Sequence, residues 1–255
     1  MSIANQKGGV GKTTTSVNLS AALSAADLKI LLVDIDPQAN ATSGLGINPS
    51  TLDRSIYDVL IDDISINDII TKTNIANLWL APSKIDLTAA ELELVSILSR
   101  ESKLKKKLDE ILSSYDFIII DCPPSLGLLT VNALVASKSV LIPLQCEYYA
   151  LEGLTKLLST IDLIKENLNK NLYIEGIVLT MYDARNNLSK EIVSEVKEYF
   201  NDLVFHSVIP RNVRLSEAPS YGQSIITYDI KSKGAESYIE LAKEILKRYE
   251  KEVIG

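Results

Sequence analysis

The sequence contains the run Lys7-Gly8-Gly9-Val10-Gly11-Lys12-Thr13-Thr14, which separates a short apolar start from a helix-like segment. Glycines allow the backbone N–H groups of a loop to turn inward around phosphate oxygens, and a helix that begins at the loop adds its positive end. In such a loop Lys12 would reach the outer phosphates, and the hydroxyl of Thr13 would coordinate Mg²⁺. The run therefore predicts a nucleotide-phosphate site between a strand and a helix.

The loop departs from the common pattern G-x-x-x-x-G-K-[ST] at the first glycine. That glycine would stand at position 6, where the sequence has Gln6, and Lys7 adds a second lysine to the loop. This layout is that of the deviant Walker A motif. A glycine-rich turn without a ligand is the alternative, but two lysines and two threonines between a strand and a helix oppose it. The predicted ATP-binding residues are Lys7, Gly8, Gly9, Val10, Gly11, Lys12, Thr13 and Thr14.

Two apolar runs end in acidic residues. Residues 30–33 are followed by Asp34 and Asp36, and strand alternation points both carboxylates the same way. Asp36 lies beyond the strand, where ligands bind in open α/β sheets, so it is a candidate for orienting water toward the γ-phosphate. A surface turn capped by Asp36 is the alternative. Residues 117–120 precede Asp121, which would hold Mg²⁺ through water in the manner of a Walker B strand.

Short β-branched runs alternate with longer amphipathic segments, which is typical of a parallel sheet with crossover helices. Most runs lack polar alternation, as in strands that are covered on both faces. We therefore expect an α/β fold, with a mainly parallel sheet and helices on both faces, in a single domain over residues 1–255. Strands are expected at 29–34, 78–81, 117–121, 139–142, 174–180 and 204–209. Helices are expected at 12–26, 89–113, 151–167, 188–200 and 235–251.

The composition limits the class of protein. The 255 residues carry a net charge of −7, which argues against a surface coated in basic residues, so any contact with nucleic acid must be local. One histidine and two cysteines, Cys122 and Cys146, cannot supply a structural zinc site or a disulfide framework, and we expect both thiols to be buried. No apolar run has the length of a membrane span and the start lacks a secretory signal, so a cytoplasmic protein is expected.

Five segments together resemble the ParA/Soj-type partition ATPases, and the resemblance covers essentially the whole chain. They are the phosphate loop, Val33-Asp34-Ile35-Asp36-Pro37-Gln38, Asp121-Cys122-Pro123-Pro124-Ser125-Leu126-Gly127, Gln145-Cys146-Glu147-Tyr148-Tyr149-Ala150-Leu151-Glu152-Gly153 and Ile209-Pro210-Arg211-Asn212-Val213-Arg214-Leu215-Ser216-Glu217-Ala218-Pro219-Ser220. The resemblance implies a P-loop NTPase of the deviant Walker A family that binds ATP and Mg²⁺ and forms an ATP-dependent homodimer. It implies that Lys7 reaches the phosphates of the other subunit. It further implies catalysis by Lys7, Lys12 and Asp36, and adenine contacts from Pro210, Arg211 and Asn212.

The resemblance also implies that the dimer binds DNA. Arg185 and Arg214 match positions that the family uses to bind double-stranded DNA without sequence preference, whereas composition alone favours surface ion pairs for both. A ParB-type centromere-binding protein is the implied partner, and the nucleoid is the implied location. Plasmid relatives often carry an additional N-terminal DNA-reading domain, for which 255 residues leave no room, so binding to a specific operator is not expected.

Two rival functions share the expected fold. A related ATPase positions the division site through a basic amphipathic C-terminal helix that binds membrane. In residues 238–254 apolar positions recur every three to four residues, but both charge signs mix on the polar face, so a core-packed helix without a membrane role is expected. Other relatives are metabolic enzymes that activate carboxylic acids or carry an iron–sulfur cluster. Two cysteines argue against a cluster, and a ligase would bind its substrate without DNA.

Overall fold

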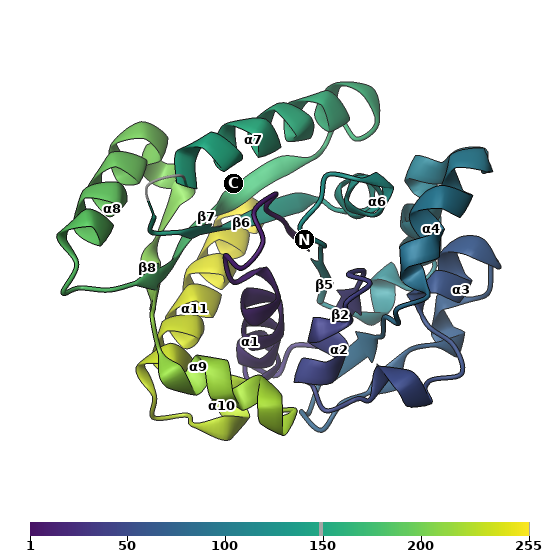
Figure 1. The fold of residues 1–255 in the computed structure, drawn as a ribbon, viewed down its shortest axis with the longest axis horizontal. Helices are drawn as coiled ribbons and strands as arrows, with labels where there is room; N and C mark the ends of the chain where they lie inside the picture. Colours follow the sequence, from purple (N-terminus) through teal and green to yellow (C-terminus); the bar gives the residue numbers. More distant parts are fainter. Residues whose placement is uncertain (148–149, 255) are drawn as a thin grey trace.

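The computed structural model describes residues 1–147 and 150–254, and within them eight strands form one sheet (Figure 1). The order across the sheet is β3-β4-β2-β5-β1-β6-β7-β8, and every pair is parallel except the edge pair β3 and β4. The strands are β1 (Ser2–Ile3), β2 (Ile30–Asp34), β3 (Thr71–Lys72), β4 (Leu78–Ala81), β5 (Phe117–Asp121), β6 (Ser139–Gln145), β7 (Tyr173–Tyr182) and β8 (Val204–Pro210). The predicted α/β class with a mainly parallel sheet is confirmed.

Helices cover both faces of this sheet. Successive residues of a strand face opposite sides, so each strand contributes to two apolar cores. In β2, Leu31 and Val33 belong to one core, whereas Ile30 and Leu32 belong to the other. The helices are α1 (Lys12–Ser24), α2 (Asn40–Gly44), α3 (Ile56–Ile61), α4 (Leu87–Glu93), α5 (Lys103–Asp109), α6 (Leu128–Ala136), α7 (Ala150–Asn167), α8 (Asn187–Phe200), α9 (Val213–Glu217), α10 (Ile225–Tyr228) and α11 (Lys233–Ile254).

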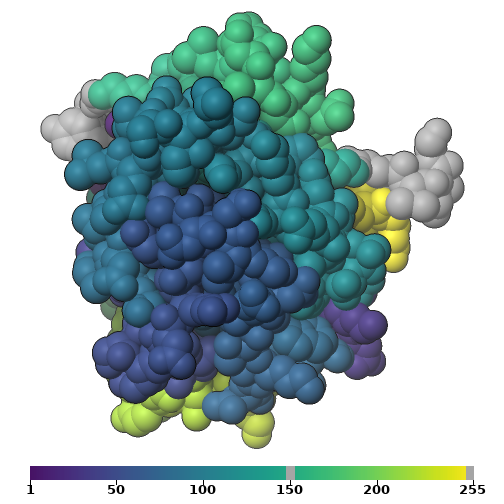
Figure 2. All heavy atoms as spheres, turned by 90° about the vertical axis from the view of Figure 1, so that its right-hand side faces the viewer, coloured from purple at the N-terminus to yellow at the C-terminus, as the bar shows by residue number. Residues whose placement is uncertain are grey.

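The two faces are covered by different parts of the chain. Helices α1 and α11 lie side by side on one face, where Leu19 and Leu241 join its core (Figure 1). The other core receives residues from α3 to α8, among them Leu60, Leu134 and Leu157. Figure 2 shows the side of the molecule that α3, α4 and their connecting loops form. That residues 1–255 make up a single domain stays a prediction.

The single helix expected at 89–113 is wrong. The chain instead forms α4 and α5, with short 3₁₀ turns at Leu94–Ser96 and Arg100–Ser102 between them. Ile97 is extended and Ser99 has a φ of 55°, so the helical hydrogen bonds are interrupted. Residues 95–99 contain two β-branched residues and two serines, all of which have low helix propensity. The sequence pattern missed this local preference because apolar residues continue at helical spacing on both sides.

The other predicted elements are confirmed with shifts of up to three residues at their ends. The bounds of β4 and β5 are as predicted, whereas the strand expected at 139–142 continues through Pro143 to Gln145. Proline is tolerated in this inner strand because β1 has already ended, so no neighbouring strand needs the missing N–H. The carbonyl of Pro143 accepts a hydrogen bond from Nδ2 of Asn5 instead, at 2.7 Å. The short strand expected before the phosphate loop is β1, whereas β3 and several short helices were not predicted.

Candidate functional site

The loops that follow β1, β2 and β5 meet near the middle of the sheet, because β5 lies between β1 and β2. Ligands bind at such a point in open α/β sheets, where chains leave adjacent strands in different directions. A cavity of about 600 Å³ opens there, and cavities of this size accommodate small molecules such as nucleotides. Its lining includes Gly8, Gly11, Lys12, Thr13, Thr14 and Asp36. The structure thus brings together the phosphate loop and the acid predicted to act in hydrolysis.

The phosphate loop is shaped by its glycines and by a contact from another strand. Gly9 and Gly11 have φ angles of 73° and 89°, in the left-handed region that other residues rarely adopt. Gly11 is the N-cap of α1, whose first turn carries no acidic residue of its own, and the positive end of the helix faces the loop. The carbonyl of Val10 accepts from Oγ1 of Thr180 on β7 at 2.8 Å. The fold therefore sets the conformation of the loop.

Lys12 is the buried cation of this site. It is 6% exposed, and its Nζ donates to the carbonyl of Lys7 at 3.0 Å. Burial lowers the pKa of Lys12 below its ordinary value, while the negative charges of Asp121 and Asp36 oppose this shift. A buried ammonium group is poorly solvated, so a phosphate oxygen that enters the cavity would be a strong partner for it. This position suits the phosphate contact predicted for Lys12.

The two predicted magnesium ligands are adjacent. Oγ1 of Thr13 donates to Oδ2 of Asp121 at 2.8 Å, and Oγ of Ser16 donates to Oδ1 at 2.7 Å. A hydroxyl and a carboxylate are hard oxygen donors, which suit Mg²⁺ when phosphates and water complete its coordination. Among the described residues, no group of three or more His, Cys, Asp or Glu side chains could hold a metal ion. A magnesium site at Thr13 and Asp121 would therefore depend on the nucleotide.

Two carboxyl groups are fully buried beside the cavity. Burial raises the pKa of Asp121 to about 7, and the charge of Asp34 adds to the shift, whereas hydrogen bonds from Ser16 and Thr13 oppose it. Burial likewise raises the pKa of Asp34 to about 6. A divalent cation bound next to Asp121 would favour its charged form. The electrostatics of the site are thus compatible with the predicted metal.

A hydrogen-bonded frame beyond the end of β2 holds Asp36. The carboxylate of Asp34 accepts from the backbone N–H groups of Asp36 and Thr42, and from the Thr42 hydroxyl. Ser83, which follows β4, donates its hydroxyl to the carbonyl of Asp36 at 2.8 Å. Asp36 itself lines the cavity, and its Oδ1 accepts from the N–H of Gln38 at 2.9 Å. The two acids therefore differ, because Asp34 supports the turn while Asp36 faces the cavity. The role of Asp36 in orienting water stays a prediction.

A second cavity, of about 350 Å³, adjoins the first. It contains all three residues predicted to contact adenine, Pro210, Arg211 and Asn212, and it shares Gly11 and Thr14 with the first cavity. Oδ1 of Asn212 caps α9, which leaves its side-chain N–H groups for a ligand. A base bound there would lie next to the phosphate loop. The adenine contacts stay a prediction.

Lys7, the second lysine of the loop, is absent from the lining of the phosphate cavity. Its Nζ lies 3.0 Å from Oε2 of Glu147 in the same chain, and the two side chains are 38% and 48% exposed. Its backbone N–H donates to Oδ1 of Asn5 at 3.0 Å. Nothing in this arrangement places Lys7 on the phosphates of its own subunit. The predicted contact across a dimer interface stays a prediction.

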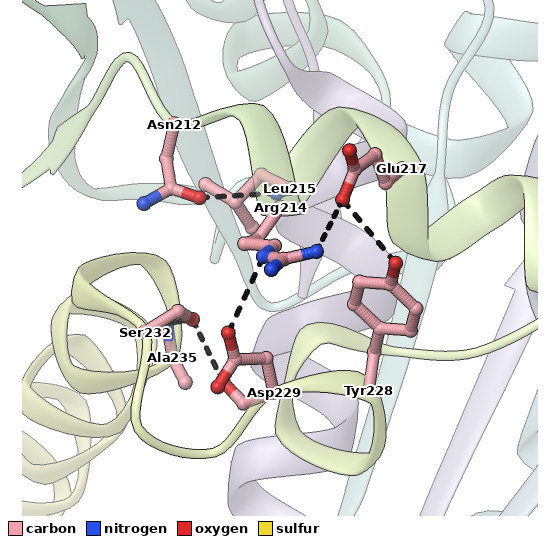
Figure 3. A network of polar contacts seen from close by, with 8 residues as sticks. All are labelled: Asn212, Arg214, Leu215, Glu217, Tyr228, Asp229, Ser232 and Ala235. Carbon is pink, nitrogen blue, oxygen red and sulfur yellow. Dashed lines mark hydrogen bonds and ion pairs between the residues drawn. The ribbon is translucent and has the colours of Figure 1, made fainter.

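The two arginines predicted to bind DNA are exposed and paired with carboxylates. Arg185 is 89% exposed, and its Nη2 lies 2.8 Å from Oδ2 of Asp183. Arg214 is 54% exposed, with its Nη1 2.9 Å from Oε2 of Glu217 and its Nε 3.6 Å from Oδ2 of Asp229 (Figure 3). Exposed pairs of this kind contribute little to stability because solvent screens them, so an incoming phosphate can replace the carboxylates at little cost. Their contact with DNA stays a prediction.

Sequence reasoning missed several polar residues that position the site. They are Asn5, Ser16, Thr42, Ser83, Glu147 and Thr180, and most of them act on backbone or carboxylate groups far away in the sequence. A usable signal existed for some of them. Ser83 and Thr180 lie at or just past the carboxyl ends of buried strands, where a polar residue faces the ligand edge of the sheet.

Comparison with known proteins places the chain in a family. Residues 1–174 match a family model described as AAA domain. The chain is 59% identical over 245 residues to the sporulation initiation inhibitor protein Soj of Bacillus subtilis, covering 96% of this chain and 97% of Soj. It is 56% identical over 246 residues to the chromosome partitioning protein ParA of Myxococcus xanthus, covering 96% and 87%. This chain belongs to the ParA/Soj family of partition ATPases. The resemblance seen in the sequence is confirmed.

Solved structures similar to this partition ATPase include cobyrinic acid a,c-diamide synthase from Mycobacterium smegmatis with bound ADP and magnesium. It is 37% identical, with a TM-score of 0.86 over 98% of this chain and 94% of that chain. The same protein has been solved with an ATP analogue and magnesium. These ligands agree with ATP and Mg²⁺, the cofactors predicted here for the ATPase.

The last helix of the ATPase packs on the core, as its mixed polar face predicted. Tyr238, Leu241 and Ile245 of α11 are buried in the same core as α1. No helix in the described part of the chain is long and apolar enough to span a bilayer. Cys122 and Cys146 are free and buried, as expected. Within the segment 145–153 that resembles the family, residues 148 and 149 (Tyr148 and Tyr149) lie outside the described residues.

Proposed function

We propose that this ATPase partitions DNA by switching between a monomer and an ATP-bound sandwich dimer that binds double-stranded DNA without sequence preference. Hydrolysis, stimulated by a ParB-type centromere-binding partner, then releases the dimer and so moves or positions the DNA. The observation that carries the proposal is the phosphate loop with its two lysines, of which Lys12 lines the same cavity as Asp36. The 59% identity to Soj supports it.

In this proposal each side chain of the cavity has a separate task. Lys12 and the N–H groups of the loop bind the phosphates, and Thr13 and Asp121 hold Mg²⁺, which neutralises phosphate charge when bound. Asp36 accepts a hydrogen bond from the attacking water and so orients it toward the γ-phosphate. Adenine lies in the second cavity against Pro210, Arg211 and Asn212.

Dimerisation links the nucleotide to DNA. Lys7 of each subunit reaches the phosphates bound by the other, so two nucleotides lie between two subunits. Arg185 and Arg214 are then presented twice on one symmetric surface, which offsets the net charge of −7. We propose a cytoplasmic, nucleoid-associated location for the same reason, because DNA is the surface that the dimer binds.

The alternatives have less support. A membrane-bound ATPase of the related division-site type would need an unpacked basic amphipathic helix, whereas the apolar residues of α11 are buried in the core. A metabolic enzyme of the same fold would bind a small carboxylic acid instead of DNA. The structure named as a diamide synthase is 37% identical to this chain, compared with 59% for Soj.

The test is to measure mass and DNA binding together. Light scattering should show a monomer without nucleotide or with ADP, and a dimer with ATP and Mg²⁺. Filter binding should show equal affinity for two unrelated duplexes with ATP and Mg²⁺. It should show no binding to either duplex without nucleotide or with ADP. A protein that dimerises but binds neither duplex at low salt would contradict the partition function. A protein that stays monomeric in ATP at micromolar concentration would contradict the switch.

A further inference from the structure

The ion pair between Lys7 and Glu147 joins the loops that follow two neighbouring strands. Lys7 follows β1 and Glu147 follows β6, and these strands are paired in the sheet. The carboxylate of Glu147 is also fixed from its own side, because Nε2 of Gln145 donates to its Oε1 and its backbone N–H donates to the carbonyl of Gln145. The pair therefore connects the Lys7 ammonium group to a carboxylate that Gln145, the last residue of β6, holds in place.

Glu147 also places a negative charge near the nucleotide cavities. It lines a small hollow of about 320 Å³ together with Met181 and Arg211. Met181 lines both nucleotide cavities as well, and Arg211 lines the proposed adenine cavity. A triphosphate would carry several negative charges into this neighbourhood, which would repel the Glu147 carboxylate and attract Lys7. In the proposed dimer, the partner's triphosphate would therefore compete with Glu147 for the ammonium group of Lys7.

We propose that Glu147 is a positioning residue that holds Lys7 on its own subunit until ATP-driven dimerisation takes the lysine away. The proposal rests on the proposed function, in which Lys7 contacts phosphates across the interface. If the pair stayed intact in the dimer, it would carry a carboxylate against the partner's triphosphate, and like charges disfavour that arrangement. Each subunit must therefore give up one ion pair when the dimer forms. Glu147 opposes dimerisation and keeps the protein monomeric at low ATP.

The size of the effect follows from the exposure of the pair. Half-exposed ion pairs typically contribute between about 0.2 and 1 kcal/mol, and a dimer breaks two of them. Removing the Glu147 charge should therefore tighten the dimer dissociation constant in ATP by about fivefold, within a range of roughly two- to thirtyfold. The nucleotide affinity of the monomer should change much less, because Lys7 does not line its own phosphate cavity.

The experiment measures the dimer dissociation constant by sedimentation in saturating ATP and Mg²⁺ for the parent, Glu147→Gln and Glu147→Ala. The matched control is Glu110→Gln, which removes the same charge from an exposed residue. Its neighbour Asp109 lines a cavity at the amino-terminal ends of β1 and β5, away from the nucleotide cavities. Both Glu147 variants should dimerise more tightly than the parent, and the control should not. An unchanged or weaker dimer in both Glu147 variants would overturn the proposal.

A double-mutant cycle with Lys7→Ala separates this ion pair from general charge repulsion. In the Lys7→Ala background, Glu147→Gln should change the dimer dissociation constant by less than about twofold, because its partner is gone. A tightening that persists at full size without Lys7 would show that Glu147 acts through another group, and would also overturn the proposal. Failure of the parent itself to dimerise in ATP would instead overturn the proposed function, and this inference with it.

Discussion

The phosphate cavity and the arginine surface of Arg185 and Arg214 hold their charges in different ways. In the cavity, Lys12 and Asp121 are buried, and their hydrogen bonds come from other elements of the fold. On the surface, both arginines are more than half exposed. Removing a buried charged partner costs about 1–3 kcal/mol or more, whereas solvent screening leaves an exposed ion pair with little effect on stability. Nucleotide binding should therefore depend on single residues, and DNA binding on how many charges are presented together.

The sharpest test of the buried region is hydrolysis in Asp36→Asn. The amide still accepts the hydrogen bond from Gln38 N–H, but its neutral oxygen is a poor partner for water that must lose a proton. The rate of hydrolysis should fall by about a hundredfold or more, with ATP affinity within a few-fold of the parent's. Single-turnover hydrolysis and nucleotide titration check the two quantities. Hydrolysis at the parental rate would show that Asp36 has another role.

Lys12→Ala should mainly affect binding. Loss of a charge-assisted contact to the phosphates should weaken ATP by roughly ten- to a hundredfold or more, and hydrolysis should fall with it. Lys29→Ala is the matched control, because Lys29 is exposed just before β2, at the amino-terminal end of the strand and away from the phosphate loop. Calorimetric titration with ATP and Mg²⁺ measures both variants. Equal affinities for Lys12→Ala and the parent would remove Lys12 from the phosphate site.

The arginine surface should give smaller and additive effects. Arg214→Ala should weaken binding to all duplexes alike and flatten the slope of log affinity against log salt by about two units, because a dimer presents the residue twice. Arg185→Ala should behave similarly. Arg54→Ala is the control, because Arg54 is 56% exposed and ion-paired, much like Arg214 at 54%. Affinities would be measured at several salt concentrations in an Asp36→Asn background that retains ATP. Unchanged slopes for both arginine variants would place the DNA surface elsewhere.

The two regions should also differ in how pH affects stability. Asp121 has a pKa of about 7 in the folded protein and an ordinary value of 3.8, so the folded state binds more protons between these values. The stabilising contribution of Asp121 to the free energy of unfolding is therefore fully present below about pH 4, and it is lost as the pH rises through 7. Asp183 has a pKa lowered to about 2 by hydrogen bonds from Arg185, so its contribution is lost only as the pH falls below about 4.

The measurement is the melting temperature without nucleotide at pH 5.5 and pH 8. Asp121 should make the parent more stable at pH 5.5, and Asp121→Asn should reduce this difference by a few degrees, since about 1 kcal/mol shifts the melting temperature of a domain this large by roughly 2–4 °C. Asp183→Asn should leave the difference unchanged, because Asp183 does not titrate in this range. The same pH dependence in all three proteins would contradict the buried-acid interpretation.

The sequence predicted those parts of the site that are local in the chain. Glycine spacing, the position of Lys12 at a helix start and the acid after a buried strand are each readable within a few residues, so the loop, Asp36 and Asp121 were found. The contacts of Lys7 with Glu147 and of Val10 with Thr180 were not, because 140 and 170 residues separate the partners. Strand order decides which distant residues meet, and no local pattern contains it.

The broken helix after β4 shows a second reason for failure. Apolar spacing predicts which side of a segment is buried, and Leu94, Leu104 and Leu108 are indeed in the core. It does not predict whether the backbone stays helical between them, because packing of those side chains tolerates the extended Ile97 and the left-handed Ser99. Burial was therefore easier to predict than the continuity of the helix.

The packing of α11 against α1 has a consequence for how the protein is synthesised. Oγ1 of Thr15 lies 3.1 Å from the hydroxyl of Tyr238, although 223 residues separate them. At about 5–20 residues per second, a ribosome needs roughly ten to forty-five seconds to pass from one to the other. Throughout that interval the nascent chain exposes the apolar side of α1 that α11 later covers. A chaperone that holds hydrophobic segments should therefore bind the nascent chain here until α11 has been synthesised.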